Sequence, residues 1–458
     1  MIRLFSVYYS TRTVIRLLGE VPLVAGSFLL AAIWLSGPDP SIPLLYENGL
    51  LKIAALTVFT LLLTYYFDLY EPQRISGGWE IYFRILLVLS ALSFVLAAVL
   101  YWDPEFAFGD NLFVAGIAIL AIILLIWRSA YEWVCNLPAF REKVYVLGRG
   151  ARAENLIEML GKRRDAGMEV IPRDSLTVPQ GAESRSYAAE LDALGALGTR
   201  VDRVIVAIEE RRGFMPLHEL LDLRYKGFLI DDANALIERL DGKLPLDGLI
   251  PSSLIFTDGF KIGAGKLLMR RLVSIGISLT GLLLCLPLIP FVMLAVRLSS
   301  PGPIFFRQTR VGRHGRPFTL VKFRTMRTDA EADGAVWATA NDPRVTRIGR
   351  FLRASRLDEI PQLWNVLKGD MSFVGPRPER PEFVGWLAKE IPFYELRHMI
   401  RPGITGWAQV RYQYGASLEE SKRKLEYDLY YVKHISLGLD LLIMFETVKI
   451  IMLGRGAR

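Results

Sequence analysis

Four long apolar runs near the start of the chain constrain its fold more than any other feature. They cover residues 17–36, 49–66, 81–101 and 112–127. A helix that spans a bilayer needs about 20 apolar residues, and each run approaches this length. The first run lies too far inside the chain for a cleaved signal peptide. The runs predict a membrane α-helical bundle over residues 1–138, and four buried helices of a soluble protein are the alternative.

The charges between these runs predict the topology. The loops at 37–48 and 102–111 contain no Lys or Arg, whereas arginines precede the first run and follow the fourth, beginning with Arg128. Lys and Arg concentrate in the cytoplasmic loops of membrane proteins. We therefore expect the N-terminus, and everything after about Arg128, to lie in the cytoplasm.

The segment at residues 139–262 has the pattern of an α/β Rossmann-like domain. A β-rich run at 143–147 leads into Gly148-Arg149-Gly150 and then into a helical pattern at 155–160. Strand, glycine turn and helix in this order open a dinucleotide-binding type of fold. Further strands are expected at 201–208 and 227–230, with a helix at 217–223 between them.

The glycine turn by itself is weak evidence for a bound nucleotide. Asp174 lies at a plausible distance along the chain for a ribose contact, but no acid is clearly placed for it. We expect this domain to be structural or regulatory and to bind no NAD.

A fifth apolar block at residues 272–298 contains Pro287 and Pro290, which remove backbone donors and bend a helix. The following stretch, 297–327, has eight Lys or Arg residues and no acid, so its translocation would violate the charge rule. The pattern predicts a re-entrant membrane helix over residues 267–298, with a fifth span as the alternative. Gly37 and Gly334 should then lie on opposite sides of the membrane.

Composition narrows the class of partner. With 52% hydrophobic and 22% charged residues, the chain is neither disordered nor typical of a purely soluble enzyme. The net charge is +13 from residue 266 onward and −5 before it, so the basic C-terminal part favours a phosphate-rich partner. Cys135 and Cys285 are the only cysteines, and four histidines form no H-x-x-x-H pair, so a zinc site is not expected.

An adjacent acid pair, Asp358-Glu359, marks the chemistry of the C-terminal part. A helix should end at Gly369, and it begins either at Ser355 with a capping box or near Asp358, where a proline at 361 is tolerated in the first turn. The second start places both carboxylates at a helix N-terminus, where the dipole favours ionised acids and phosphate. Arg353 and Arg356 should add to this effect and make Asp358 less basic than a free aspartate.

Two turn-rich loops follow, and each holds one arginine among prolines and glycines. These are Arg377, in the sequence GPRP, and Arg401, in the sequence RPGITG. Rigid loops of this kind present a guanidinium to phosphate. A basic, aromatic β-hairpin is expected at 303–323, and Asp428 lies isolated on a later helical face.

Residues 266–458 resemble the bacterial sugar transferase family, the monotopic polyprenyl-phosphate phosphoglycosyl transferases. The resemblance rests on five strings in order: FFRQ, KFRTM, LDEIPQ, GDMSFVGPRP and RPGITGWAQV. The four spans and the Rossmann-like segment resemble the large form, which begins exopolysaccharide or O-antigen assembly. This similarity implies an α+β catalytic domain over residues 263–458.

The resemblance implies a reaction at the cytoplasmic face of the bacterial inner membrane. A UDP-sugar and undecaprenyl phosphate would give undecaprenyl-diphospho-sugar and UMP, with Mg²⁺. Asp358 corresponds to the nucleophile that forms a covalent phosphosugar intermediate, and Glu359 to the neighbouring Mg²⁺-binding acid. The matching polar positions expected to bind substrate are Lys322, Arg324, Arg353, Arg377, Arg401 and Asp428.

Three questions stay open from the sequence. No role for nucleic acid is expected, whereas a homodimer remains an option. A membrane-tethered enzyme that modifies nucleotide-sugars with the Rossmann-like domain is one rival function, and a non-catalytic membrane scaffold is another. The sugar that is transferred cannot be identified from these motifs.

Overall fold

The structure is a computed structural model. It describes residues 1–35, 44–45, 48–71, 78–106, 111–175, 187–196, 201–209, 215–249, 251–256, 258–260, 262–330, 342–412 and 417–454. Gly37 and Gly334, chosen above to report the topology, lie outside these ranges. The chain separates into an N-terminal unit, Met1–Ile2 with Tyr9–Leu236, and a C-terminal unit, Arg3–Tyr8 with Ile237–Arg458. The three domain ranges expected from the sequence stay predictions.

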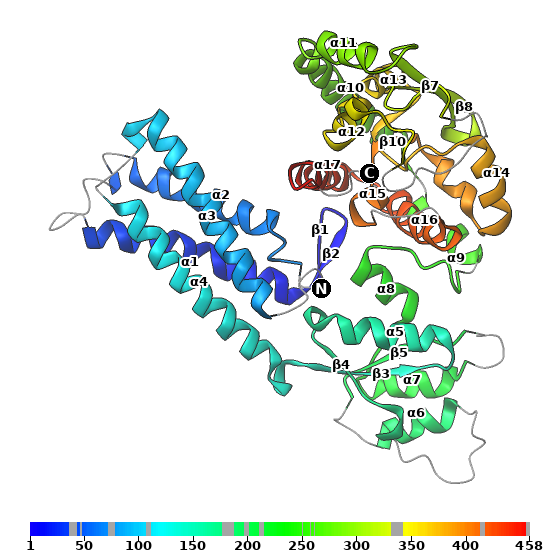
Figure 1. The fold of residues 1–458 in the computed structure, drawn as a ribbon. Helices are drawn as coiled ribbons and strands as arrows, with labels where there is room; N and C mark the ends of the chain where they lie inside the picture. The colour runs from blue at the N-terminus through cyan, green and yellow to red at the C-terminus, as the bar shows by residue number, and fades with distance from the viewer. Residues whose placement is uncertain are drawn as a thin grey trace. The chain divides into compact units, whose positions relative to one another are not determined.

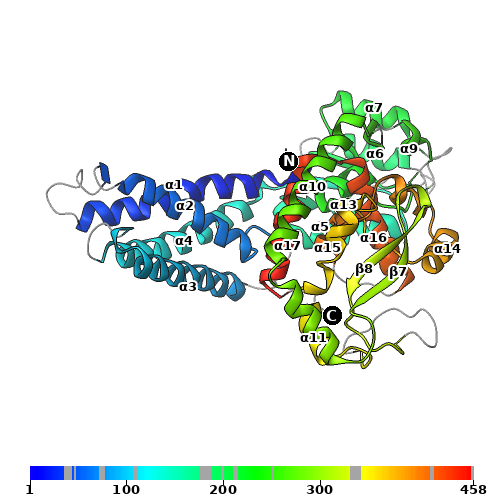
Figure 2. The same ribbon diagram turned by 90° about the horizontal axis from the view of Figure 1, so that it is seen from above.

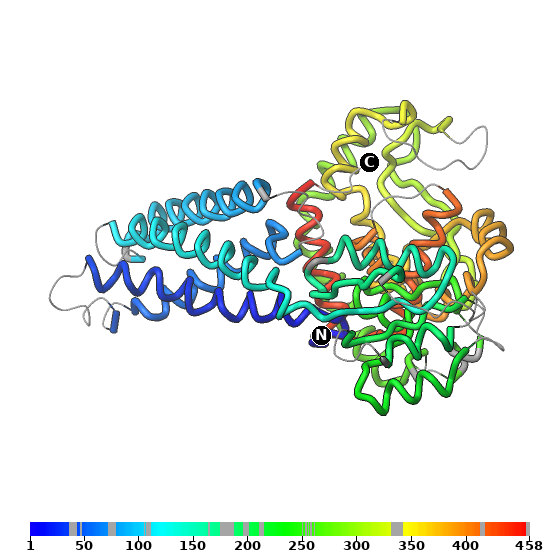
Figure 3. The backbone as a smooth tube through the Cα atoms, turned by 90° about the horizontal axis from the view of Figure 1, so that it is seen from below, coloured from blue at the N-terminus to red at the C-terminus, as the bar shows by residue number. Residues whose placement is uncertain are grey.

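Four long helices form a bundle in the N-terminal unit (Figures 1 and 3). They are α1 (Thr11–Leu35), α2 (Gly49–Tyr66), α3 (Gly78–Trp102) and α4 (Leu112–Asn136). Phe28, Leu92 and Leu120 are fully buried between them, whereas Trp34 and Phe94 are exposed on the outside. Among the described residues, five helices are long and apolar enough to cross a membrane: these four and α10 (Ala264–Cys285). This is the composition of a membrane protein, and the predicted apolar runs are confirmed as helices.

A buried ion pair ties α1 to α4 inside the bundle. The Glu20 carboxylate is fully buried, and Arg128 Nη2 lies 2.8 Å from its Oε1 atom. The Tyr70 hydroxyl donates a hydrogen bond to the same carboxylate, and Arg128 Nη1 donates to Leu69 O at 3.1 Å. A charge inside an apolar bundle is tolerated only with such partners, so these contacts fix the pairing of the two helices.

A four-stranded parallel sheet forms the rest of the N-terminal unit. Its strands are β3 (Glu142–Leu147), β4 (Met168–Val170), β5 (Arg203–Val206) and β6 (Leu229–Asp232), in the order β4-β3-β5-β6. Helix α5 (Ala151–Lys162) covers one face, and α6 (Tyr187–Ala196) and α7 (Leu217–Tyr225) cover the other (Figure 1). The alternation of the strands explains this, because Tyr145 and Leu147 pack with Leu191 and Leu220 of α6 and α7. The strands and helices expected here are confirmed.

The C-terminal unit carries a broken helix followed by a long hairpin (Figure 2). Helix α10 ends at Cys285, and α11 (Ile289–Ser299) begins after a short turn that contains Pro287. In that turn Leu288 N donates to Cys285 O at 2.9 Å, which satisfies one of the freed carbonyls. The break at the prolines was predicted. The hairpin pairs β7 (Phe305–Val311) with β8 (Pro317–Phe323), as expected.

Shorter elements complete this unit around the hairpin. A parallel pair of strands, β9 (Ser372–Val374) and β10 (Gly403–Thr405), lies among helices. The helices are α9 (Pro251–Phe256), α12 (Arg347–Ala354), α13 (Gln362–Lys368), α14 (Pro381–Glu390), α15 (Trp407–Arg411), α16 (Leu418–Lys433) and α17 (Leu437–Met452). The division of the chain into two units falls inside three further elements. These are the paired strands β1 (Ile2–Leu4) and β2 (Val7–Tyr9), and helix α8 (Ala233–Asp241).

Both halves of the broken helix pack against the C-terminal unit. At the start of α10, Arg270 Nε donates to Asp440 Oδ2 of α17 at 2.6 Å. Near the end of α11, Val296 is buried in a cluster with Phe323 and Leu352. Between these anchors the surface is apolar and exposed. It is formed by Leu272, Leu279, Leu283, Leu284, Leu286, Phe291 and Leu294.

Candidate active site

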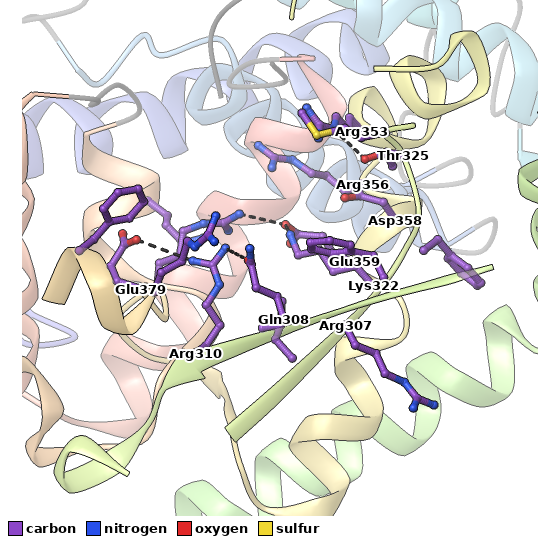
Figure 4. A pocket seen from close by; sticks show the side chains of 18 of the residues that line it. Arg307, Gln308, Arg310, Lys322, Thr325, Arg353, Arg356, Asp358, Glu359 and Glu379 are labelled. Carbon is purple, nitrogen blue, oxygen red and sulfur yellow. Dashed lines mark hydrogen bonds and ion pairs between the residues drawn. The ribbon is translucent and has the colours of Figure 1, made fainter. Parts of the chain in front are cut away.

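A cavity of about 1120 Å³ lies in the C-terminal unit beside the hairpin (Figure 4). The hairpin, the connection from α12 to α13, the loop after β9, α14 and α16 supply its walls. Among the described residues that line it, twelve are Arg or Lys and four are Asp or Glu. Seven of the predicted site residues are brought together here: Lys322, Arg324, Arg353, Asp358, Glu359, Arg377 and Asp428.

The backbone explains why the acid pair faces this cavity. Helix α12 ends at Ala354, and the Ser355 hydroxyl donates back to Phe351 O at 2.8 Å, so Ser355 closes one helix rather than starting the next. A left-handed residue, Arg356 (φ +58°), turns the chain into a short 3₁₀ helix, Leu357–Glu359. Helix α13 follows and ends at Gly369 (φ +101°) as predicted. The second of the two predicted helix starts, near Asp358, is therefore the better description.

Two cations neutralise Glu359. Its Oε1 atom accepts from Lys322 Nζ at 2.8 Å and from Arg377 Nη2 at 3.3 Å. Burial alone would raise the pKa of Glu359, but Lys322 and Arg377 outweigh it and hold the pKa well below its usual range. Burial lowers the pKa of Lys322, although the Glu359 carboxylate opposes this. Glu359 is thus a fixed negative charge at the centre of a basic wall.

Asp358 differs from its neighbour. It is 6% exposed, and no hydrogen bond between described residues involves its carboxylate. Burial raises its pKa, and the nearby charges of Lys322 and Arg353 only partly offset this. The prediction that the arginines make Asp358 less basic than a free aspartate is therefore wrong, because loss of hydration outweighs their attraction. A buried carboxylate with free lone pairs and raised basicity is suited to nucleophilic attack.

The comparisons with known proteins agree with this geometry. A family model described as bacterial sugar transferase matches residues 265–454. A UDP-glucose:undecaprenyl-phosphate glucose-1-phosphate transferase of Escherichia coli is 33% identical over 440 residues, which cover 92% of each chain. The chain belongs to the bacterial sugar transferase family.

Two further relatives align with about half or more of this transferase. An undecaprenyl-phosphate glucose phosphotransferase of Komagataeibacter xylinus is 31% identical over 403 residues, 81% of this chain and 75% of its own. A UDP-N-acetylgalactosamine-undecaprenyl-phosphate N-acetylgalactosaminephosphotransferase of Aeromonas hydrophila is 43% identical over 228 residues. That alignment covers 48% of this sugar transferase and about half of the Aeromonas protein, 52%.

The structure gives two of the predicted substrate-binding arginines different surroundings. Arg353 Nε donates to Thr325 Oγ1 at 3.0 Å, and its guanidinium lines the cavity near Asp358. Arg324 also lines the cavity, but its Nη2 atom donates to Ser300 O at 2.6 Å and to Ser300 Oγ at 3.0 Å. Arg324 therefore joins the end of β8 to the end of α11, which is a structural contact.

Two other predicted residues have surroundings that do not suit direct contact with a phosphate. The described lining does not include Arg401, whose pKa is lowered by burial and by neighbouring arginines. Asp428 is 2% exposed, and its Oδ2 atom accepts from Arg397 Nη2 at 2.7 Å. Arg397, like Arg310 and Glu379 of the same lining, was missed by the sequence analysis, because it lies in a segment without a recognisable motif.

The site offers the oxygens that a hard divalent cation needs, provided that the substrate supplies the others. Among the described residues, no group of three His, Cys, Asp or Glu side chains could hold a metal ion. Mg²⁺, however, is commonly bound by one or two carboxylates together with substrate phosphates. The second oxygen of Glu359 fits this mode, since the described cations bind only Oε1 of Glu359.

At the glycine turn of the parallel sheet, a carboxylate of the protein itself occupies the position where a phosphate would bind. Glu209 Oε1 accepts from Arg152 N at 3.2 Å, at the start of α5, where a phosphate would bind in a dinucleotide fold. Gly148 is required by packing, because a Cβ atom there would lie 2.6 Å from Ala207 O. Nearby, the buried Glu190 carboxylate accepts from Arg149 at 2.7 Å and from Arg173 at 2.8 Å. Glu190 is thus the shared acceptor of two arginines of the sheet domain.

Proposed function

We propose that this protein transfers a sugar-1-phosphate from a UDP-sugar to undecaprenyl phosphate and releases UMP. The observation that carries the proposal is the Asp358 carboxylate in a cavity where twelve basic side chains face four acids. Such an excess of cations suits a diphosphate donor and a phosphate acceptor. The names of the relatives, which act on undecaprenyl phosphate and transfer a sugar phosphate, support the same substrates.

In the proposed mechanism, Asp358 is the nucleophile. Its carboxylate oxygen attacks the phosphorus that bears the sugar, the bond from this phosphorus to the UMP oxygen breaks, and UMP leaves with the electron pair. A phosphate oxygen of undecaprenyl phosphate then attacks the same phosphorus, and the bond to Asp358 breaks to regenerate the carboxylate. Two steps at one nucleophile let a soluble donor and a lipid acceptor use the site in turn.

The side chains around Asp358 have separate parts in this proposal. Lys322 and Arg377 hold Glu359 in place and offer further donors to the phosphates, and Arg353 neutralises charge on the other side of Asp358. Mg²⁺ would be held by Glu359 and by substrate phosphate oxygens, where it would shield the charge that gathers on the leaving group.

We infer that the broken helix α10–α11 is re-entrant and that the cavity lies at the cytoplasmic face of the inner membrane. Arg270 near one end and Val296 near the other both pack on the same folded unit, which supports entry and exit on one side. The eight basic residues at 297–327 support a cytoplasmic location. The exposed leucines between the two ends would then contact lipid.

We further propose that the parallel sheet is a Rossmann-like domain without a nucleotide cofactor. The Glu209 carboxylate at the start of α5 supports this, since a phosphate that bound there would have to displace it. Arg149 and Arg173 already bind the Glu190 carboxylate. The domain would then contribute stability or regulation rather than redox chemistry.

The function is tested by measuring UMP release from a panel of UDP-sugars with undecaprenyl phosphate and Mg²⁺. The proposal expects acceptor-dependent formation of a lipid diphospho-sugar from at least one donor, and the panel identifies the sugar. Release of a modified UDP-sugar with stoichiometric bound NAD(P), and no lipid product, would instead support a nucleotide-sugar-modifying enzyme.

A further inference from the structure

The loop that carries Arg377 has no regular secondary structure, yet its backbone is held at every step. The carbonyl oxygens of four successive residues, from Pro376 to Glu379, each accept a hydrogen bond from another element. The donors are Gly403 N (2.9 Å), Arg397 Nη2 (3.0 Å), Arg310 Nη1 (3.0 Å) and Val311 N (2.9 Å), in that order. A loop fixed in this way can present one guanidinium in one position.

Arg397 is the donor that is bonded to Arg377 itself, and it is buried. It is 6% exposed, and Asp428 and Tyr394, which flank it, are 2% and 3% exposed. Its Nη1 atom donates to the Tyr394 hydroxyl at 2.8 Å, and its Nη2 atom is shared between Asp428 Oδ2 and Arg377 O. The planar fork of one guanidinium thus joins α16, the 3₁₀ helix Tyr394–Met399 and the Arg377 loop.

The chain of contacts ends at the acid pair. Arg377 Nη2 donates to Glu359 Oε1, which also accepts from Lys322. A movement of the Arg377 backbone would therefore move the cation that binds Glu359 beside the nucleophile. Among the described residues, Asp428 is connected to the acid pair through Arg397, because its hydrogen-bonded oxygen faces that guanidinium and its side chain is almost fully buried.

We propose that Arg397, held by Asp428, is a positioning residue that fixes Arg377 against Glu359, so that Asp428 serves the reaction without contacting substrate. This inference rests on the proposed function and refines the assignment of Asp428 as a substrate-binding residue. Its consequence is that substitutions at Arg397 and Asp428 act through Arg377. They should lose their effect once the Arg377 guanidinium is removed.

The test is a double-mutant cycle between Arg397→Gln and Arg377→Gln, each measured for kcat and KM of UMP release and for the Kd of UDP. Arg397→Gln should lower kcat/KM by about tenfold to a hundredfold, as expected for a misplaced substrate-orienting group. In the Arg377→Gln background, Arg397→Gln should lower kcat/KM by less than about threefold. Asp428→Asn should likewise lower kcat/KM in the wild type and have little effect in the Arg377→Gln background. Equal factors in both backgrounds would overturn the proposal.

Tyr394→Phe removes a single hydrogen bond from Arg397 and keeps the shape of the core. If Arg397→Gln does not fold, a double-mutant cycle between Tyr394→Phe and Arg377→Gln tests in its place whether Arg397 acts through Arg377. Tyr430→Phe is the matched control, because its hydroxyl donates to Ser6 O and it does not line the described cavity. Its effect on kcat/KM should be small and should be the same in both Arg377 backgrounds.

Failure of the proposed function looks different. The wild type would then bind UDP without releasing UMP, and the Kd values of UDP would still decide whether Arg397 acts through Arg377.

Discussion

At the start of α5, Glu209 accepts from the backbone and two arginines share the Glu190 carboxylate, whereas the cavity around Asp358 holds three times as many basic as acidic side chains. In the sheet domain, Glu190 accepts from Arg149, Arg173 and Tyr145, and Glu209 occupies the helix N-terminus. In the cavity, Glu359 is similarly neutralised, but Asp358 beside it keeps free lone pairs. The two regions contain the same residue types. They differ in how many basic side chains exceed the acids and in whether a carboxylate stays without a hydrogen-bond donor among the described residues.

The difference teaches where an anionic substrate can bind. A phosphate that enters the sheet domain would have to displace a carboxylate of the chain, whereas one that enters the cavity meets cations that already exceed the acids. Glycine turns and arginines alone therefore do not identify a phosphate site. The charge balance of the assembled site does.

The largest effect that sharpens this comparison is expected from Asp358→Asn. The substitution keeps the shape of the side chain and removes the nucleophilic charge, so turnover should fall by at least about a thousandfold, as for loss of a covalent nucleophile. Steady-state UMP release measures this, and Asp247→Asn, at an exposed surface pair with Lys422, is the control that should leave turnover unchanged. Near-normal turnover of Asp358→Asn would remove Asp358 from the mechanism.

The next largest effect is expected on stability, from Glu190→Gln in the sheet domain. Glu190 is 4% exposed, and its loss leaves two arginines without their shared acceptor, which should cost about 2–3 kcal/mol in the free energy of unfolding. Glu169→Gln, at an exposed pair 3.9 Å from Arg141, should cost less than about 1 kcal/mol. Thermal unfolding and UMP release together test this, and a selective loss of catalysis in a stable Glu190→Gln protein would contradict it.

The same carboxylate predicts a pH dependence. Burial alone would raise the pKa of Glu190, but its hydrogen bonds from Arg173 and Arg149 outweigh this and lower the pKa. Its contribution to stability is therefore present above the unfolded-state pKa and lost as the pH falls through the lower folded-state value. The difference in melting temperature between wild type and Glu190→Gln should be largest near neutral pH and should shrink only in acid. A difference that grows as the pH falls would reverse the sign of this account.

Gly150→Leu should destabilise the sheet domain by about 1–3 kcal/mol, because φ +89° and ψ −174° form a conformation that is almost restricted to glycine. Gly161→Leu, inside the helix α5 that Gly150 precedes, is the matched control, since a Cβ atom there meets nothing within 4 Å. The KM for the UDP-sugar should be unchanged in folded Gly150→Leu protein. A well-folded variant with a selectively raised KM for a nucleotide would show that the turn binds one.

The smallest effect is expected from Glu359→Gln. The variant loses the charge that Lys322 and Arg377 share, so rate and metal affinity should fall together by about tenfold, near 1.4 kcal/mol. A titration of UMP release with Mg²⁺ measures both. Glu382→Gln, on the exposed face of α14, provides the baseline. If Glu359→Gln abolished turnover and Asp358→Asn did not, the assigned roles would be exchanged.

Much of this architecture could be predicted from local patterns. The apolar runs, the prolines at 287 and 290, the strand at 143–147 and the helix end at Gly369 each reflect a periodicity or a backbone restriction within a few residues. Ordered motifs also indicated which arginines and acids would gather at one site. These features depend on neighbouring residues alone and could therefore be predicted from the sequence.

The rest depends on contacts between distant residues. Arg397 and Asp428 lie 31 positions apart, and no spacing rule connects them. Motif residues Arg324 and Arg401 look equivalent to Arg377 in the sequence, yet one is bonded to Ser300 and the other lies outside the described lining. The basicity of Asp358 was misjudged for the same reason, because its burial depends on elements that pack over it from elsewhere in the chain.

The central claim, that Asp358 is a covalent nucleophile, is tested most directly by mixing the purified enzyme with the UDP-sugar and Mg²⁺ in the absence of undecaprenyl phosphate. Intact-mass spectrometry should show an adduct of one sugar phosphate on the wild type and on Glu359→Gln, with one UMP released for each adduct and none on Asp358→Asn. An adduct on Asp358→Asn, or release of UMP only when the lipid acceptor is present, would contradict the covalent mechanism and favour a direct displacement between donor and acceptor.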